Sequence, residues 1–447
     1  MPKLDHQAGT WRWGLLCLIF LAPFFFLSYG FANHYAAGLI DVPNIVFSWE
    51  KSIPLWPWTI VPYWSIDLFY GLSLLLCWNK FELRQHAFRL FSAQLISISC
   101  FLLFPLKFSF ERPELHGFFG LWFDILMGFD KPFNQAPSLH IVLLIILWDF
   151  YARHVKPSAR WLVHLWCSLI GISVLTTWQH HFIDIPTGVW VGAFCLWLFP
   201  LQGKSPFQAQ SMQYKTVKHL KLAGYYLFAS AVLTCIAAYF QGWALWLTYP
   251  ASSFLLVATA YALNRFHFFQ KQANGSMTLA AWILFAPYFA LAKLNSRIWT
   301  RSHQKDSLVL EVNQTQIFLG RIPSSTQAQH YEGLLDCCAE LPLTPRQAYQ
   351  QALSLDLIPL QPQQLANGVL ALNELIQYKP SKILIFCALG YSRSSSILAA
   401  WLLHTQQAHH VAEAVQIIHR ARPWIVLNSA QLEALNTYQA EYLKAKL

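Results

Sequence analysis

A cysteine and an arginine lie six residues apart in the stretch FCALGYSRSSS, Phe386 to Ser396. The apolar run KILIF, residues 382–386, predicts a strand that ends at Cys387, and ILAAWLLH after Arg393 predicts a helix. A loop at a helix N-terminus presents backbone N–H groups that bind phosphate and favour a thiolate. Because the guanidinium of Arg393 can hold two phosphate oxygens, the pattern predicts a phosphate site with a cysteine nucleophile.

Two further residues of this loop fit the same chemistry. Gly390 lies in its middle, where a tight turn can require a positive φ. Ser394 can donate a hydrogen bond to the sulfur of Cys387 and help it leave a phosphoenzyme. The alternative is a buried cysteine at a strand end, which is the commoner fate of cysteine. The strand before the loop and the helix after it favour the phosphate site.

The loop resembles the signature of the protein tyrosine and dual-specificity phosphatases: cysteine, two residues, glycine, two residues, arginine, then serine or threonine. The resemblance covers about residues 308–440 and implies a small α/β domain. In that family an aspartate about thirty residues upstream protonates the leaving oxygen, and Asp356 matches it, unless it is only a solvated loop residue. The family's usual histidine before the cysteine is Phe386 here, which implies that the thiolate is stabilised less or differently.

A second group of ionisable residues lies between apolar runs, where such residues are functional candidates. Three stretches hold them: FPLKFSFERPE, NQAPSLH and WQHHFIDIPTG. The candidates are Lys107, Arg112, Ser138, His140, His180 and Asp184. An imidazole held by a carboxylate can attack phosphorus, a second imidazole can protonate the leaving alcohol, and cations can neutralise the phosphate. The alternative is that these histidines only anchor the chain at the membrane interface.

These stretches resemble the three motifs of the type 2 phosphatidic acid phosphatase superfamily over about residues 55–201. The resemblance implies His180 as nucleophile, Asp184 as its orienting carboxylate and His140 as general acid. Leucine in Pro-Ser-Leu-His resembles the inositol phosphorylceramide synthase-like branch, and the motifs imply phosphate binding by Lys107, Arg112 and Ser138. The lysine-to-arginine spacing is four residues rather than the usual six, and Val174 stands where the family has an arginine. His181 has no assigned role.

The composition places most of the chain in a membrane. Of the 447 residues 55% are hydrophobic and 12% charged, against about 25% charged in soluble proteins. Residues 1–305 hold 22 Lys and Arg and 11 Asp and Glu, whereas residues 306–447 hold 9 and 10. The basic surplus therefore belongs to membrane loops, and we expect no nucleic-acid partner. The runs long enough to be predicted spans are 13–30, 57–77, 87–106, 138–152, 161–178, 185–201, 222–240, 243–263 and 279–294.

We expect an all-α polytopic membrane domain with about nine transmembrane helices and a six-helix phosphatase core, followed by a small α/β cysteine-phosphatase domain. Within the tail, SLVLEV and TQIFLG predict strands, and residues 366–378, 393–404 and 411–420 predict helices. The expected domains are 1–54, an N-terminal helix and loop; 55–201, the phosphatidic acid phosphatase-like domain; 202–305, further spans and a basic linker; and 306–447, the dual-specificity phosphatase-like domain.

The loop charges orient the chain in a bacterial inner membrane. The positive-inside rule puts the N-terminus in the cytoplasm and the loops 107–137 and 179–184 on the periplasmic side. For the cysteine domain two signals disagree. Nine spans end on the outer side, whereas basic residues after the ninth run and the reducing cytoplasm favour the inner side. The count gives the outer side a slight preference, and an eight-span count would reverse it.

The sequence thus predicts a membrane phosphatase with one histidine-based and one cysteine-based site, acting on phosphomonoesters of lipids or lipid-linked substrates. The nine cysteines show no Cys-x-x-Cys or zinc-type spacing, so we expect no metal and no cofactor. One alternative is a lipid head-group phosphotransferase. Another is a membrane protein whose tail is a protein phosphatase or a phosphate-binding module. The lipid itself, the order of the two sites and the oligomeric state are left open.

Overall fold

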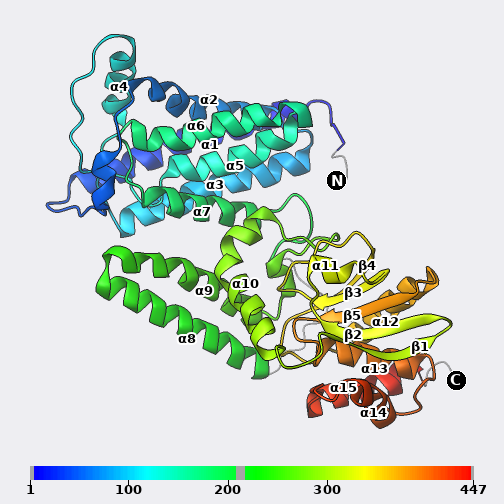
Figure 1. Ribbon diagram of the computed structural model, residues 1–447. Coiled ribbons are helices and arrows are strands. Elements are labelled where there is room, and N and C mark those ends of the chain that lie inside the picture. The colour runs from blue at the N-terminus through cyan, green and yellow to red at the C-terminus, as the bar shows by residue number, and fades with distance from the viewer. Residues whose placement is uncertain (1–4, 208–216, 444–447) are drawn as a thin grey trace. The chain divides into compact units, whose positions relative to one another are not determined.

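The computed structural model describes residues 5–207 and 217–443, and it divides into two compact units, Met1–Ser205 and Pro206–Leu447 (Figure 1). Residues 1–4, 208–216 and 444–447 lie outside the described residues. The ends of the expected domains 1–54 and 306–447, and part of the expected segment 202–305, therefore lie outside them as well.

The first unit is helical. Its helices are α1 (Thr10–Ala37), α2 (Ile60–Leu75), α3 (Lys80–Leu103), α4 (Gly117–Phe129), α5 (Leu139–His154), α6 (Arg160–Thr176) and α7 (Asp184–Leu198), with the 3-10 turns η1 (Ser48–Ser52), η2 (Pro57–Thr59) and η3 (Pro157–Ala159). Each of the first six predicted apolar runs coincides with one of these helices. The helix α4 was not predicted and lies in the segment expected to be an outer loop.

The second unit begins with three helices and continues into an α/β domain. The helices are α8 (Val217–Phe240), α9 (Thr248–Ala262) and α10 (Leu279–Trp299), with η4 (Gly242–Leu247) and η5 (Phe266–Phe269). The strands are β1 (Asp306–Val312), β2 (Thr315–Arg321), β3 (Gly333–Cys338), β4 (Ala348–Ser354) and β5 (Lys382–Cys387). The remaining helices are α11 (Ser325–Ala328), α12 (Pro362–Gln377), α13 (Arg393–His404), α14 (Val411–Ala421), α15 (Ser429–Tyr438) and the π-helical turn η6 (Gln439–Leu443).

The five strands form one sheet in the order β1-β2-β5-β3-β4, in which only the β1–β2 pair is antiparallel. The central strand β5 is apolar on both faces, as expected for a parallel strand covered on both sides. Val369, Leu372 and Leu398 belong to the core on one face, whereas Leu384 and Phe386 belong to a smaller core on the other. The carboxyl ends of β2, β3 and β5 therefore meet at one edge.

Several described helices fit a multi-pass membrane protein. Six are long and apolar enough to cross a bilayer by length and composition: Thr10–Ala37, Lys80–Leu103, Pro157–Thr176, Val217–Phe240, Gly242–Ala262 and Leu279–Trp299. The helices α2, α5 and α7 have 15 or 16 residues, which is shorter than the 17–25 of an ordinary span.

Candidate active site

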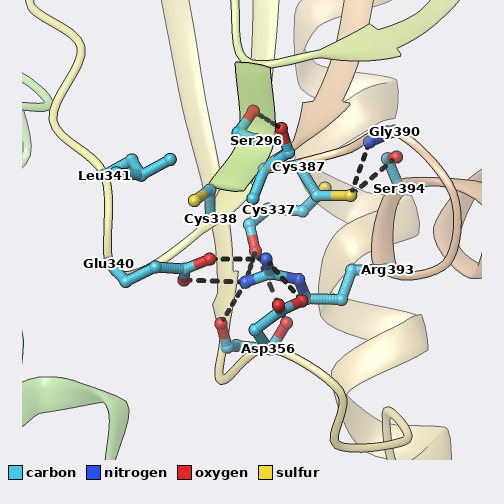
Figure 2. A network of polar contacts seen from close by, with 12 residues as sticks. Ser296, Cys337, Cys338, Glu340, Leu341, Asp356, Cys387, Gly390, Arg393 and Ser394 are labelled. Carbon is cyan, nitrogen blue, oxygen red and sulfur yellow. Dashed lines mark hydrogen bonds and ion pairs between the residues drawn. The ribbon is translucent and has the colours of Figure 1, made fainter. Parts of the chain in front are cut away.

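The cysteine loop connects the carboxyl end of β5 to the first turn of α13. Cys387 ends the strand and is 3% exposed, and Arg393 begins the helix. Gly390 adopts a φ of 71°, and its N–H donates to the Cys387 sulfur at 3.2 Å. A Cβ at this glycine would lie 2.3 Å from the carbonyl of Gly320, so only glycine fits. The loop is thus curled around the sulfur, as Figure 2 shows.

The surroundings of the sulfur favour the thiolate. Burial alone raises the pKa of Cys387, but the charge of Arg393 and hydrogen bonds from Ser394 outweigh it and leave the pKa below its ordinary value. The Ser394 hydroxyl lies 3.4 Å from the sulfur. Phe386, which replaces the usual histidine, is fully buried in the core. The sequence allowed weaker or different stabilisation, and the structure shows that arginine, serine and the backbone provide it.

Arg393 lies between two carboxylates, one of which the sequence did not single out (Figure 2). Its Nη1 and Nη2 donate to the two carboxylate oxygens of Glu340 at 2.9 and 2.6 Å. Its Nη2 also lies 2.9 Å from Oδ1 of Asp356. Burial opposes the charge on Glu340, but Arg393 holds the pKa of that carboxyl below its ordinary value. Glu340 therefore remains ionised and fixes the guanidinium.

Asp356 lies beside Arg393 of the cysteine loop. It follows β4, and its side chain is 30% exposed while pairing with Arg393. Burial raises the pKa of this carboxyl, Arg393 opposes the rise and the negative charge of Glu340 adds to it, so the net pKa is raised. A raised pKa increases the protonated fraction near neutrality, which suits a general acid.

The structure also brings His180, Asp184 and Ser138 together. Nδ1 of His180 lies 2.9 Å from Oδ2 of Asp184, and its Nε2 lies 3.1 Å from the Ser138 hydroxyl. The other Asp184 oxygen accepts the N–H of Ala136 at 2.8 Å. The carboxylate at the start of α7 is therefore fixed and orients the imidazole through one nitrogen.

His140 and His180 line one cavity of about 50 Å³, together with Tyr29, Tyr63 and Asp130. The ring of His140 stacks on Tyr63 with centroids 4.1 Å apart. Its buried Nε2 has no hydrogen-bond partner within the described parts of the chain. The Asp130 carboxylate accepts the Tyr29 hydroxyl at 2.8 Å. The sequence did not single out Asp130, although an acid directly after the apolar run 117–129 is a usable signal.

The two predicted phosphate-binding cations lie elsewhere. Among the described residues, neither Lys107 nor Arg112 lines the histidine cavity. Arg112 donates to the carbonyls of Thr177 and Trp178 at 3.1 and 2.9 Å, and so completes the end of α6. His181, which had no predicted role, lies with its Nδ1 2.9 Å from Glu50. Within residues 5–207 and 217–443, no cluster of three or more His, Cys, Asp or Glu side chains is arranged for a metal ion.

Comparison with known proteins identifies the tail. The family model for the dual specificity phosphatase catalytic domain matches residues 363–441. The chain is also similar to a solved structure of PTPMT1 in complex with PI(5)P, with 16% identity over 32% of this chain and 100% of that chain, at a TM-score of 0.27. A solved structure of human DUSP28 is similar at 17% identity, over 31% of this chain and 96% of that chain, with a TM-score of 0.27.

A leucine-rich repeat and phosphatase domain protein from Entamoeba histolytica is similar at 13% identity, over 32% of this chain and 96% of that chain, with a TM-score of 0.27. No curated protein matches the chain significantly. The segment matched by the family model contains Cys387, Gly390, Arg393 and Ser394 but not Asp356. The tail thus carries a cysteine-based phosphatase domain of the dual specificity type, and the protein is a phosphoric monoester hydrolase.

Proposed function

We propose that this protein is a multi-pass membrane phosphatase that hydrolyses phosphomonoesters of lipids or lipid-linked substrates. The observation that carries the proposal is the position of the cysteine site within its own unit. The hydroxyl of Tyr261, on the apolar helix α9, donates to the backbone carbonyl of Asp356 at 3.3 Å. Tyr226 of α8 stacks on Tyr261 with ring centroids 5.5 Å apart. Apolar helices therefore reach the catalytic aspartate directly.

The cysteine site would work through a phosphoenzyme. The thiolate of Cys387 attacks phosphorus, and the bond from phosphorus to the ester oxygen breaks as Asp356 protonates that oxygen. Nε of Arg393 is buried and has no partner among the described residues, so it can bond a phosphate oxygen without displacing Glu340. Water then attacks the phosphocysteine while Asp356 removes its proton, and Ser394 stabilises the departing thiolate.

A second, histidine-based site is part of the proposal. His180, held by Asp184 at 2.9 Å, has the geometry of an oriented nucleophile, and His140 lines the same cavity as a candidate proton donor. Ser138 contacts the reacting nitrogen and would bind the phosphate there. Lys107 and Arg112 remain candidates for phosphate binding only if the substrate extends beyond this cavity. This site would face the periplasm of a bacterial inner membrane, and neither site would need a metal.

A phosphate-release assay on the purified full-length protein tests the proposal. The substrates are a panel of lipid phosphates and an aryl phosphate, and the variants are Cys387→Ser, His180→Ala and the double variant. We expect each single variant to lose activity toward some of these substrates and the double variant to lose activity toward all of them. No release from any lipid phosphate, with the aryl phosphate still hydrolysed, would overturn the lipid assignment.

The runner-up function is a head-group phosphotransferase, which the Leu139 in Pro-Ser-Leu-His favours. The same assay distinguishes it when glycerol or a second lipid alcohol is added. A transferase forms a new phosphoester at the expense of free phosphate, whereas a hydrolase releases the same amount of phosphate with or without the alcohol.

A further inference from the structure

The phosphatase domain contacts the segment that precedes helix α10 and also the last turns of that helix. Before its first turn, Lys271 donates to Asp336 at 2.5 Å, and the carbonyl of Gly275 accepts the N–H of Leu343 at 3.1 Å. Both partners belong to β3 or the loop that follows it. The segment 271–277 is therefore fixed to the β3 side of the sheet.

The far end of α10 contacts the cysteine loop. The hydroxyl of Ser296 donates to the carbonyl of Ala388 at 2.6 Å, next to Cys387 (Figure 2). Nδ1 of His303 lies 2.7 Å from the hydroxyl of Tyr391. Between the two ends, Ala292 packs against the core that contains Phe386. The chain before α10 and the last turns of α10 are therefore both fixed to the phosphatase domain.

These contacts are incompatible with α10 as a transmembrane span. Its 21 residues extend over about 30 Å, which is the thickness of the hydrocarbon layer. If α10 crossed that layer, the phosphatase domain, which contacts the chain just before α10 and the end of α10, would have to extend across the layer as well. The unpaired backbone N–H and C=O groups of its edge strands, β1 and β4, would then lose their hydrogen bonds to water without gaining new ones. Length and composition alone do not reveal this, because α10 is as apolar as a span.

The face of α10 directed away from the domain fits an anionic lipid surface. Opposite Ala292 and Ser296, which contact the domain, this face carries the exposed apolar side chains of Leu279, Leu291, Leu294 and Ile298. Trp282 and Trp299 are also exposed, nearer to the side that contacts the domain. Residues 264–305 contain six Lys and Arg and no Asp or Glu. Lys293 and Arg301 lie exposed near this face. Basic charge beside apolar and aromatic side chains complements anionic head groups on the cytoplasmic side.

We propose that α10 lies on the cytoplasmic surface of the membrane and docks the cysteine domain onto anionic lipid. Helix α8 and the stretch Gly242–Ala262, which comprises η4 and α9, then cross as a hairpin whose tip near Gln241 is on the opposite side. Without α10 the count of predicted spans falls from nine to eight, and the domain lies in the cytoplasm rather than on the outer side. The inference rests on the proposed membrane location but on no particular substrate. It places the cysteine site at the cytoplasmic leaflet.

Single cysteines at the two ends of α10 test this topology. Asn274→Cys and Ser302→Cys are made in a Cys235→Ser background, which removes the exposed native thiol, and Trp243→Cys in η4 is the matched control. A membrane-impermeant maleimide is applied to intact cells and to inside-out vesicles. We expect the cysteines at positions 274 and 302 to react only in the vesicles, and the cysteine at position 243 to react only in intact cells. Reaction of 274 and 302 from opposite sides, or of either from outside, overturns the proposal.

Two controls separate this outcome from other failures. Hydrolysis of a soluble aryl phosphate by each variant, made in a His180→Ala background, shows that the cysteine domain is folded. Recovery of the protein in the membrane fraction tests the membrane location itself, so a protein found only in the soluble fraction rejects the proposed function rather than the topology.

Discussion

At the scale of single residues, the sulfur of Cys387 and the carboxyl of Asp356 have pKa values moved in opposite directions. The reactive form needs the thiolate and the protonated acid. With an aryl phosphate and the His180→Ala variant, we expect kcat/KM to rise with pH as the thiol ionises and to fall as Asp356 ionises. Asp356→Asn should remove the fall at higher pH and keep the rise. A fall that persists in Asp356→Asn would assign the acid to another group.

The loss of rate caused by Asp356→Asn should also depend on the leaving group of the substrate. Loss of a general acid costs about 10²–10⁴-fold in rate when the leaving oxygen needs a proton. We therefore expect a large loss for alkyl or lipid phosphates and a small loss for an activated aryl phosphate. Rates of phosphate release for the two substrate types measure this difference, and equal losses would contradict the assignment.

Glu340 shows what sequence reading missed at this scale. Cys387, Gly390, Arg393 and Ser394 were found because one loop carries them at fixed spacing. Glu340 follows a different strand, and only the parallel pairing of β3 with β5 brings it to Arg393. Breaking a buried ion pair by removing one partner costs about 3–5 kcal/mol, so Glu340→Ala should lower the unfolding free energy by that order.

The same ion pair predicts a pH dependence of stability. Because the folded-state pKa of Glu340 lies below its ordinary value, its stabilisation is present above that value and is lost as pH falls through the folded pKa. Glu340→Gln should lack this acid-dependent loss. Thermal unfolding of both proteins from neutral to acidic pH measures it, and parallel curves would argue against the pair as a source of stability.

At the scale of elements, the predicted apolar runs all coincide with helices, because length and hydropathy are local properties. The helix α4 was missed because its 13 residues are too short for a span. The strands β3 and β4 were also missed. In β3, GLLDCC carries a buried acid, Asp336, whose charge is neutralised by Lys271 from a distant segment. In β4, AYQQALS lacks a continuous apolar face. Tertiary partners, rather than periodicity, determine both strands.

The contact of Lys271 with Asp336 should therefore couple two elements that lie far apart in the chain. Lys271→Met leaves a buried carboxylate unpaired, and Asp336→Asn leaves a buried ammonium, each costing about 3–5 kcal/mol. In the double variant neither charge remains, so its loss should be smaller than the sum by about 0.5–3 kcal/mol. Unfolding of the four proteins in detergent measures this coupling, and strict additivity would contradict it.

At the scale of the whole molecule, two candidate phosphoryl-transfer sites lie in separate units. Because the two sites share no residue, a substitution that inactivates one of them should leave the activity of the other unchanged. Full-length Cys387→Ser should keep any lipid-phosphate hydrolysis that His180→Ala or His140→Ala removes. If Cys387→Ser has no activity on any lipid phosphate, the helical unit is a scaffold rather than a second enzyme.

The central claim is that lipid phosphate is hydrolysed through a phosphocysteine at Cys387. The most direct measurement is to quench the full-length protein in acid during turnover of a lipid phosphate and to map the phosphoryl group by mass spectrometry. We predict phosphate on the peptide that contains Cys387, and none on that peptide in Cys387→Ser. Release of phosphate from the lipid by a His180→Ala protein that carries no phosphocysteine would contradict the account.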